Sequence, residues 1–188
     1  MSYVFYRAIT NTDMNNHTPQ ETGHPILGQD GGEIPLQSSS EHQEVAAHFA
    51  QQAQRELRIF TYDLDAAIFG RPAFTEAVKQ LIIGHRNASV RILLQDCARI
   101  QQEGHRLIDL GQRLTSRIEI RRPGPEHINH HENFLTADHK GFIHREFYDR
   151  YDGSADFYAP LKTSQLDNYF ADAWEHSEPY TELRRLHI

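Results

Sequence analysis

This 188-residue sequence has only one cysteine, no long apolar run and no excess of positive charge. Cys97 is the single cysteine, so no disulfide can form within the chain, and a reducing cytoplasm is the expected compartment. No apolar stretch reaches the roughly 20 residues that a membrane-spanning helix needs. The first residues, Met1 to Arg7, have neither the basic start nor the apolar core of a signal peptide. The sequence therefore predicts a cytoplasmic protein without a membrane span.

The charge balance of the chain is acidic. There are 19 Lys and Arg against 26 Asp and Glu, which gives a formal net charge of −7. Proteins that coat nucleic acid are usually basic, so the bulk charge argues against that role, although it leaves room for a local basic patch. The 13 histidines could bind metal or make the charge sensitive to mildly acidic pH. For most of them we expect solvated surface positions.

The first 32 residues differ in composition from the rest. Asn, Thr, Gln, Gly, Pro and Asp dominate residues 11–32, and the apolar residues Ile26 and Leu27 stand together near the end. Such a segment buries too little apolar surface to offset the entropy that it loses on ordering. We therefore expect a flexible N-terminal tail over residues 1–32 and one domain over residues 33–188.

The domain shows alternating strand and helix patterns. Strands are expected over residues 33–36, 57–64, 90–96, 118–121, 134–137 and 141–144. Helices are expected over residues 74–83, 98–114 with a break near Gly104, and 165–177, after a first helix that begins at Ser40 with a capping box to Gln43. This order predicts an α/β fold with a mixed, mostly parallel sheet that is flanked by helices on both faces.

One stretch combines residues that suit phosphoryl chemistry. His131 is followed two positions later by Asn133 and seven positions later by Asp138. This is the spacing of the phospholipase D signature, His-x-Lys-x-x-x-x-Asp, with Asn133 in place of the Lys. Fifteen positions after Asp138 comes Gly153-Ser154-Ala155-Asp156. It resembles the Gly-Ser-x-Asn segment of the same superfamily, with Asp156 in place of the Asn.

The region from Glu33 to Ser177 thus resembles one half of a phospholipase D-like protein. It is most similar to a group of uncharacterised bacterial phospholipase D-like proteins, which share stretches such as Gly104-His105-Arg106-Leu107 and Trp174-Glu175-His176-Ser177. In active members two signatures meet, one His attacks phosphorus, the other protonates the leaving oxygen, and each Asp orients a His. The resemblance implies that His131 and Asp138 are the catalytic residues and that a chain with one signature forms a homodimer. It also implies chemistry through His with no metal and no cofactor.

The departures from the signature weaken the site for phosphate. Asn133 and Ser154 can donate hydrogen bonds to phosphate but carry no charge, and loss of one donor of this kind typically costs about 3–4 kcal/mol of transition-state stabilisation. An ionised Asp156 would repel phosphate. Arg121 and Arg145 are the arginines best placed in sequence to supply the missing charge, although a solvated strand end is an equal reading of Arg121.

Two further clusters have alternative readings. His105 and Arg106 could hold an anion at a helix start, or they could cap and pair within the fold. The loop residues His127, His130, His131 and Glu132 could bind a metal, but their spacing fits no established zinc motif, so we predict no metal site.

Two functional hypotheses follow. The first is a degenerate, catalytically impaired module that binds a phosphate-bearing ligand or a protein partner. The alternative is an active, metal-independent phosphodiesterase or nuclease that acts through His131 in a homodimer. A phosphate-containing ligand or nucleic acid is the possible partner. An acetyltransferase is rejected, because the sequence lacks the glycine-containing loop that holds the pyrophosphate of acetyl-CoA.

Overall fold

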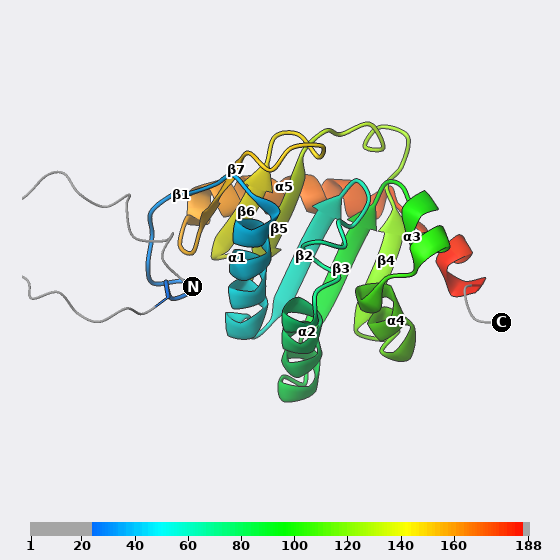
Figure 1. Cartoon of the computed structure of the whole chain (residues 1–188), viewed down its shortest axis with the longest axis horizontal. Helices are drawn as coiled ribbons and strands as arrows, with labels where there is room; N and C mark the ends of the chain where they lie inside the picture. The colour runs from blue at the N-terminus through cyan, green and yellow to red at the C-terminus, as the bar shows by residue number, and fades with distance from the viewer. Residues whose placement is uncertain (1–23, 186–188) are drawn as a thin grey trace, which may run out of the picture.

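A computed structural model describes residues 24–185 of the chain, and residues 1–23 and 186–188 lie outside the described part (Figure 1). The centre of the molecule is one mixed sheet with the strand order β1-β7-β6-β5-β2-β3-β4-β8. The strands are β1 (Ile34–Leu36), β2 (Glu56–Thr61), β3 (Ser89–Leu94), β4 (Ile118–Arg122), β5 (Asn133–Ala137), β6 (Gly141–Arg145), β7 (Gly153–Asp156) and β8 (Glu178–Pro179). The helices are α1 (Ser39–Gln52), α2 (Pro72–Gly84), α3 (Ala98–Glu103), α4 (Arg106–Arg113), α5 (Pro160–Glu175) and a short 3-10 helix (Thr181–Arg185).

The α/β class and the flanking of the sheet by helices on both faces are confirmed. Helices α1, α2 and α4 cover one face, and α5 crosses the other (Figure 1). Parallel pairing is less extensive than expected, because it is confined to β2–β3 and β3–β4 among the described strands. The chain after β4 returns through the antiparallel strands β5, β6 and β7, whose short connections cannot form parallel crossovers.

Three helices, α1, α2 and α5, begin earlier than the sequence indicates. Helix α1 is capped by Ser38, whose hydroxyl accepts from the backbone of Glu41 while the Glu41 carboxylate accepts from the Ser38 backbone. The capping box therefore lies two residues before the expected pair at Ser40 and Gln43, because a Ser followed three residues later by Glu competes with it. Helix α5 begins at Pro160, five residues before the expected start, and Pro is well suited to the first helical turn.

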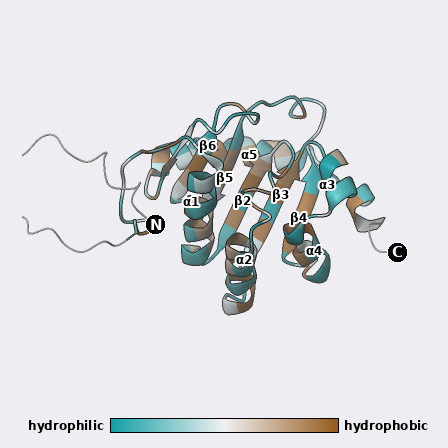
Figure 2. Ribbon diagram, viewed as in Figure 1, coloured by the Kyte–Doolittle hydropathy of each residue, from teal (hydrophilic) through white to brown (hydrophobic). Residues whose placement is uncertain are grey.

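Two apolar cores lie on the two sides of the sheet. The larger one packs the aliphatic side chains of β2 and β3, among them Ile59 and Ile92, against α1, α2 and α4. The smaller one packs Phe60, Phe134 and Phe170 between the sheet and α5. Figure 2 shows this arrangement as apolar strands between helices whose outer faces are polar. No helix of the described part is long and apolar enough to cross a membrane.

Residues 24–32 dock on the domain, which corrects the expected boundary at residue 33. Leu27 is 7% exposed and belongs to the larger core. The Leu27 amide donates to Gln52 Oε1 at 2.8 Å, and Gln52 Nε2 donates to Pro25 O at 2.9 Å. The Gly28 amide donates to Phe157 O at 2.8 Å. The low apolar content of residues 24–32 gave no sign of this contact in the sequence. One buried leucine and a few backbone hydrogen bonds are enough to hold the segment on the domain. Residues 1–23 of the expected tail lie outside the described residues.

Replacement of Leu27 tests the docking. Leu27→Ala should lower the free energy of unfolding by about 2–3 kcal/mol, because it removes buried methyl groups from the core. Ile26→Ala is the matched control, since Ile26 is 47% exposed and its loss should change stability little. Urea denaturation of both variants gives the comparison. Equal, small effects would mean that the segment is a free tail.

Candidate functional site

The candidate site lies where β2 ends and β5 begins. In sheets of this class, side chains that follow the carboxyl ends of parallel strands line ligand crevices. Tyr62, Asp63 and Asp65 follow β2, and Asn133 opens β5, which runs antiparallel to β2 and so begins at the same edge. Arg145 ends β6 directly opposite Asn133. We call these five residues the carboxyl-edge cluster; it lies at the upper edge of the sheet in Figure 1.

Asn133 occupies the position of the signature Lys and makes a structural hydrogen bond. Its Oδ1 atom accepts from the backbone amide of Tyr62 at 2.9 Å, which ties the start of β5 to the end of β2. The side chain is 4% exposed, and Nδ2 is buried without a hydrogen-bond partner among residues 24–185. A cavity of about 20 Å³ lies against Asn133 and Arg145, and its size suits one water molecule. This position therefore holds an uncharged side chain inside the protein.

Arg145 is the buried cation nearest to Asn133, and its charge is matched inside the protein. The residue is 3% exposed, and Nη1 lies 3.8 Å from Asp65 Oδ2. Nη1 also donates to Arg150 O at 3.4 Å, and the guanidinium lies 5.4 Å from the centre of the Tyr151 ring. The Tyr151 hydroxyl in turn donates to Asp65 at 3.0 Å. Arg145 thus directs its charge toward a carboxylate of the same chain.

The acidic side chains make the carboxyl-edge cluster unfavourable for an anion. Burial raises the pKa of Asp63, and the neighbouring Asp65 raises it further. Burial lowers the pKa of Arg145, and the charge of Asp65 opposes that shift. Two carboxyl groups therefore share one guanidinium. A phosphate group entering here would meet carboxylates that already satisfy the cation, and in partly buried surroundings repulsion between like charges amounts to a few kcal/mol, roughly 4 at 4 Å.

His131 is exposed and lies just before β5. Its backbone carbonyl accepts from the Tyr148 amide at 2.9 Å, and the Tyr148 ring stacks on Tyr62 with centroids 4.0 Å apart. No hydrogen bond or ion pair within residues 24–185 involves the imidazole ring of His131. The backbone of the loop is therefore anchored beside the site, while no group of residues 24–185 orients the imidazole of the candidate nucleophile.

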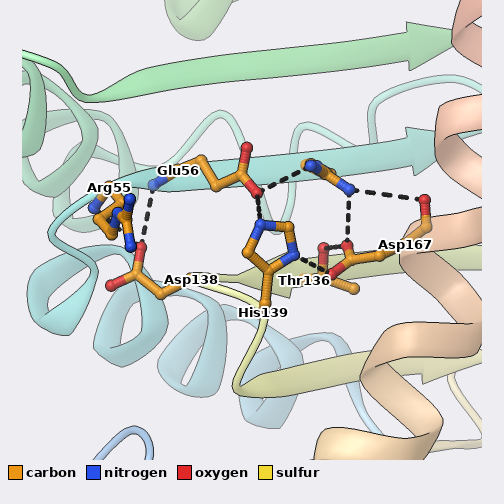
Figure 3. Close-up of polar contacts among 7 residues, drawn as sticks. Arg55, Glu56, Thr136, Asp138, His139 and Asp167 are labelled. Carbon is orange, nitrogen blue, oxygen red and sulfur yellow. Dashed lines mark hydrogen bonds and ion pairs between the residues drawn. The ribbon is translucent and has the colours of Figure 1, made fainter.

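Asp138 does not face His131, which corrects its expected role. The two residues lie beyond opposite ends of β5, and seven extended residues span roughly 20 Å. The Asp138 carboxylate instead accepts from the backbone amides of Gln54, Arg55 and Glu56 at 2.9, 2.8 and 2.9 Å. Figure 3 shows Asp138 beside Arg55 and Glu56. Its function in this fold is to bind the amino end of β2 to the β5–β6 turn, where Asp138 has a φ of 52°.

A charged cluster next to Asp138 strengthens the same turn. His139 bridges two carboxylates: Nδ1 lies 2.6 Å from Asp167 and Nε2 lies 2.6 Å from Glu56 (Figure 3). The Thr136 hydroxyl donates to Asp167 at 2.6 Å, and Arg58 pairs with Glu56 at 2.9 Å and with Asp167 at 3.3 Å. These contacts join β2, the hairpin turn and α5 at the edge opposite the candidate site.

Ser154 is not brought together with Asn133. Strand β7 is separated from β5 by β6, and Ser154 lines a cleft on the α5 face, whereas Asn133 points toward α1. Asp156, in the position of the expected Asn, accepts from the amides of Gly32 at 3.2 Å and Tyr158 at 2.8 Å. Its carboxylate is thus used to hold backbone, and the Gly-Ser segment lies one strand too far from the signature strand to complete the expected phosphate site.

The cleft at Ser154 contains a histidine that the sequence did not single out. This cleft has a volume of about 740 Å³ over β6, β7 and the start of α5. His144 lies in it opposite Ser154 in the strand register, and His144 Nε2 lies 2.6 Å from Glu132 Oε2. The charged residues of the lining are Arg150, Lys162, Glu33, Glu146, Asp152 and Asp156. Only the β5–β6 register places His144 beside Glu132, and that register cannot be read from a motif.

Arg121 is distant from the signature strand. It lies on β4, three strands from β5, which corresponds to roughly 14 Å. Its guanidinium packs 4.5 Å from the centre of the Trp174 ring and pairs with Glu119 at 3.1 Å. The expectation that Arg121 reaches the mouth of the site is therefore not met within one chain.

His105 follows the structural alternative, whereas Arg106 neither caps a helix nor forms an ion pair among residues 24–185. His105 is the N-cap of α4, and its Nδ1 atom accepts from the Leu107 amide at 3.2 Å. His105 is 6% exposed, whereas Arg106 is exposed. Gly104 separates α3 from α4 with a φ of 74°, a value that glycine adopts without strain. A capping nitrogen that accepts a backbone hydrogen bond is not free to bind an anion.

The fold is shared with phospholipase D family members. Nuc from Salmonella typhimurium, a phospholipase D family member, superimposes with a TM-score of 0.58 at 13% identity, over 80% of this chain and 99% of Nuc. Phosphatidylserine synthase of Haemophilus influenzae gives 0.53 at 15% identity over 81% of this chain and 41% of the synthase. TrmBL2, an archaeal chromatin protein that binds DNA, gives a TM-score of 0.56 at 14% identity. The superposition includes 80% of this chain and 54%, about half, of TrmBL2. The chain therefore has a phospholipase D-like fold.

One protein-family model matches most of the chain. The family described as "Domain of unknown function (DUF7931)" matches residues 38–186, and the chain belongs to that family. No curated protein is detectably similar in sequence.

Two substitutions test which of Asp138 and His131 stabilises the fold. Asp138→Asn should lower the free energy of unfolding by about 2–4 kcal/mol, because an amide cannot accept three hydrogen bonds as a carboxylate does. His131→Ala should leave stability almost unchanged, since the ring is exposed and makes no contact of this kind. Chemical denaturation measures both. If Asp138→Asn were as stable as the wild type, the anchoring role of the carboxylate would be refuted.

Two buried histidines predict a loss of stability in mild acid. Burial lowers the pKa of His42 and of His105 to about 4, whereas the unfolded value is near 6.5. The unfolded chain therefore binds more protons between pH 6.5 and 4, and stability falls as pH falls through that window, by roughly 3 kcal/mol for each histidine.

The replacement His105→Asn isolates one of these contributions. Asn keeps a capping acceptor for α4 but does not titrate, so the fall in stability from pH 6.5 to 4 should be clearly smaller than in the wild type. Carboxylates contribute equally to both proteins, and exposed His85→Asn serves as the control. Parallel pH profiles for the wild type and His105→Asn would contradict the prediction.

Proposed function

We propose that this chain is a degenerate phospholipase D-like module that has lost efficient phosphodiester hydrolysis and acts by binding a partner. The carrying observation is the exchange of the signature Lys for a buried Asn133 that holds the Tyr62 backbone. Efficient hydrolysis concentrates negative charge on phosphoryl oxygens, and the protein has to supply fixed positive charge there. The position that should supply it makes a structural hydrogen bond instead.

The internal pairing of Arg145 supports the same conclusion. A cation in this place could substitute for the Lys, but Asp65 already lies 3.8 Å from it, and the charge of Asp63 also acts on it. To bind phosphate, Arg145 would have to leave the partly buried Asp65 carboxylate without its charged partner, and separating such a pair is destabilising. Of the two partner classes expected from the sequence, a protein partner therefore fits the carboxyl-edge cluster better than a phosphate-bearing ligand.

Exposed apolar side chains near the large cleft support a protein partner. Phe147 lines that cleft and is 47% exposed, and Tyr158 and Leu161, the chain neighbours of the cleft residues Ala159 and Lys162, are 47% and 77% exposed. Exposed large apolar residues are common at contact surfaces. A homodimer, as the one-signature architecture implies, is the partner that this proposal names first.

The alternative function is a metal-independent phosphodiesterase in a homodimer. One observation favours it: His144 is hydrogen-bonded to Glu132, only one residue from exposed His131. An imidazole held by a carboxylate is the usual arrangement of an activated base. In this alternative, His131 attacks phosphorus, and a positive charge from the partner copy replaces the missing Lys.

A phosphodiester assay distinguishes the two functions. The full chain, tested with bis(p-nitrophenyl) phosphate and single-stranded DNA in EDTA, should hydrolyse neither substrate above the level of His131→Ala. Loss of the Lys charge in both copies of a dimer predicts rates at least about 10⁴-fold below a working site. Turnover in EDTA that is abolished by His131→Ala would overturn the proposal and establish the alternative.

Analytical ultracentrifugation of the same preparations measures whether the chain forms a dimer. Phe147→Asp and Leu161→Asp should weaken a dimer that uses the exposed apolar residues. Ile83→Asp should not, because Ile83 lies on α2, where it is 64% exposed. A chain that remains monomeric at all concentrations would exclude the homodimer and leave a different protein as the partner.

A further inference from the structure

A group of metal-ligating side chains lies outside the candidate site, where the loop before β5 meets the end of α5. His127 comes from that loop, Asp172 from the last turn of α5, and His176 from the residue that caps α5. One potential ligand atom of each residue lies within 4.8 Å of the other two. Neither the phospholipase D signature nor the carboxyl-edge cluster includes any of them.

His127 provides the observation that points to a ligand. It is 7% exposed, and its Nε2 atom is buried without a hydrogen-bond partner among the described residues. That atom points toward Asp172 Oδ2 at 3.3 Å. A buried unpaired nitrogen costs free energy, so native proteins rarely leave one without a function.

The other nitrogen of His127 is placed as metal-binding histidines require. Nδ1 lies 3.2 Å from the Tyr169 hydroxyl, and the two rings meet edge to face. When Nδ1–H donates to that oxygen, the lone pair of Nε2 faces Asp172. In metal sites this outer hydrogen bond sets the tautomer and direction of the ring.

Asp172 and His176 suit the same site. They lie four residues apart on one helical turn, so both side chains point to the same side. His176 Nδ1 donates to Asp172 O at 2.9 Å, which leaves its Nε2 atom unprotonated in the neutral ring. Both side chains are about 60% exposed, so they can move toward an ion that the buried His127 receives. The end of a helix also attracts a cation through the helix dipole.

We propose that His127, Asp172 and His176 bind a divalent transition-metal ion of the zinc class. Two imidazoles and one carboxylate form a donor set that zinc accepts, with water as a fourth ligand. Ligands at about 2.0–2.1 Å in a tetrahedron are roughly 3.3 Å apart, and the present separation of His127 Nε2 and Asp172 Oδ2 is 3.3 Å. The bland alternative is an ion pair between His127 and Asp172 that needs no metal.

The ion would join the loop that carries His130 and His131 to α5. His130 stacks on Tyr169 with centroids 4.4 Å apart, and Gln95 donates to its backbone carbonyl at 2.7 Å. A metal at His127 would therefore fix the loop at a point four residues before His131. The site is distinct from the proposed partner binding and does not depend on it.

Zinc binding by the full chain without a histidine tag tests the proposal. Equilibrium dialysis with elemental analysis should give one tightly held zinc per chain, and free zinc at about 100 times its Kd should raise Tm by roughly 5–10 °C. Co²⁺ in the same site should show the intense visible absorption of a tetrahedral ion. His176→Ala and Asp172→Asn, both at exposed positions that preserve the core, should abolish this stoichiometric binding.

Two further variants keep the result interpretable. Tyr169→Phe should weaken zinc affinity by roughly 10–100-fold, as expected for loss of an outer hydrogen bond to a ligand histidine. His48→Ala removes a ligand from a second group of potential ligands, His24, Glu44 and His48, and should leave binding unchanged. The proposal is overturned if zinc binds only weakly and at several sites, as an adventitious ion only, or if His48→Ala rather than His176→Ala removes it.

Discussion

The Asp138 carboxylate and the three backbone amides that it binds at the start of β2 are the contact on which the arrangement of the domain depends. Strands β2 and β5 are distant in sequence and antiparallel, and a shift of one residue would turn every side chain of β5 to the other face. The three hydrogen bonds exclude such a shift. They also determine what happens at the far end of β5, where Asn133 meets the Tyr62 amide and Arg145 lies opposite Asn133.

The side chains at the two ends of β5 therefore make different kinds of contact. At the turn, charges are compensated in a closed cluster of Glu56, Arg58, His139 and Asp167, which connects the hairpin to α5. At the carboxyl edge, one buried guanidinium meets two acidic groups, and the position of the signature Lys is neutral. The chain thus has a phospholipase D-like fold in which Asn133, two positions after His131, is an uncharged residue. This combination is why we infer a binding module.

The sheet also separates side chains that a linear motif places together. Ser154 and Asn133 belong to one expected phosphate site, but an additional antiparallel strand, β6, lies between their strands. Because side chains alternate between faces along a strand, the offset puts Ser154 with His144 on the α5 face and Asn133 with Arg145 on the α1 face. The result is two separate polar regions, one at the carboxyl edge and one in the cleft, in place of a single site.

The sequence by itself determined the α/β class, the order of most elements, the break between two helices at Gly104, and the presence of the uncharged Asn133 two positions after His131. These follow from local periodicity and residue chemistry, which act over a few neighbouring residues. Only the tertiary structure decided that Asp138 anchors a turn, that Arg145 is neutralised by Asp65, that Leu27 belongs to the core, and that His127 meets Asp172 and His176. Each of these depends on contacts between segments far apart in the chain, and strand register and the face on which a side chain emerges are set by the packing of the whole domain.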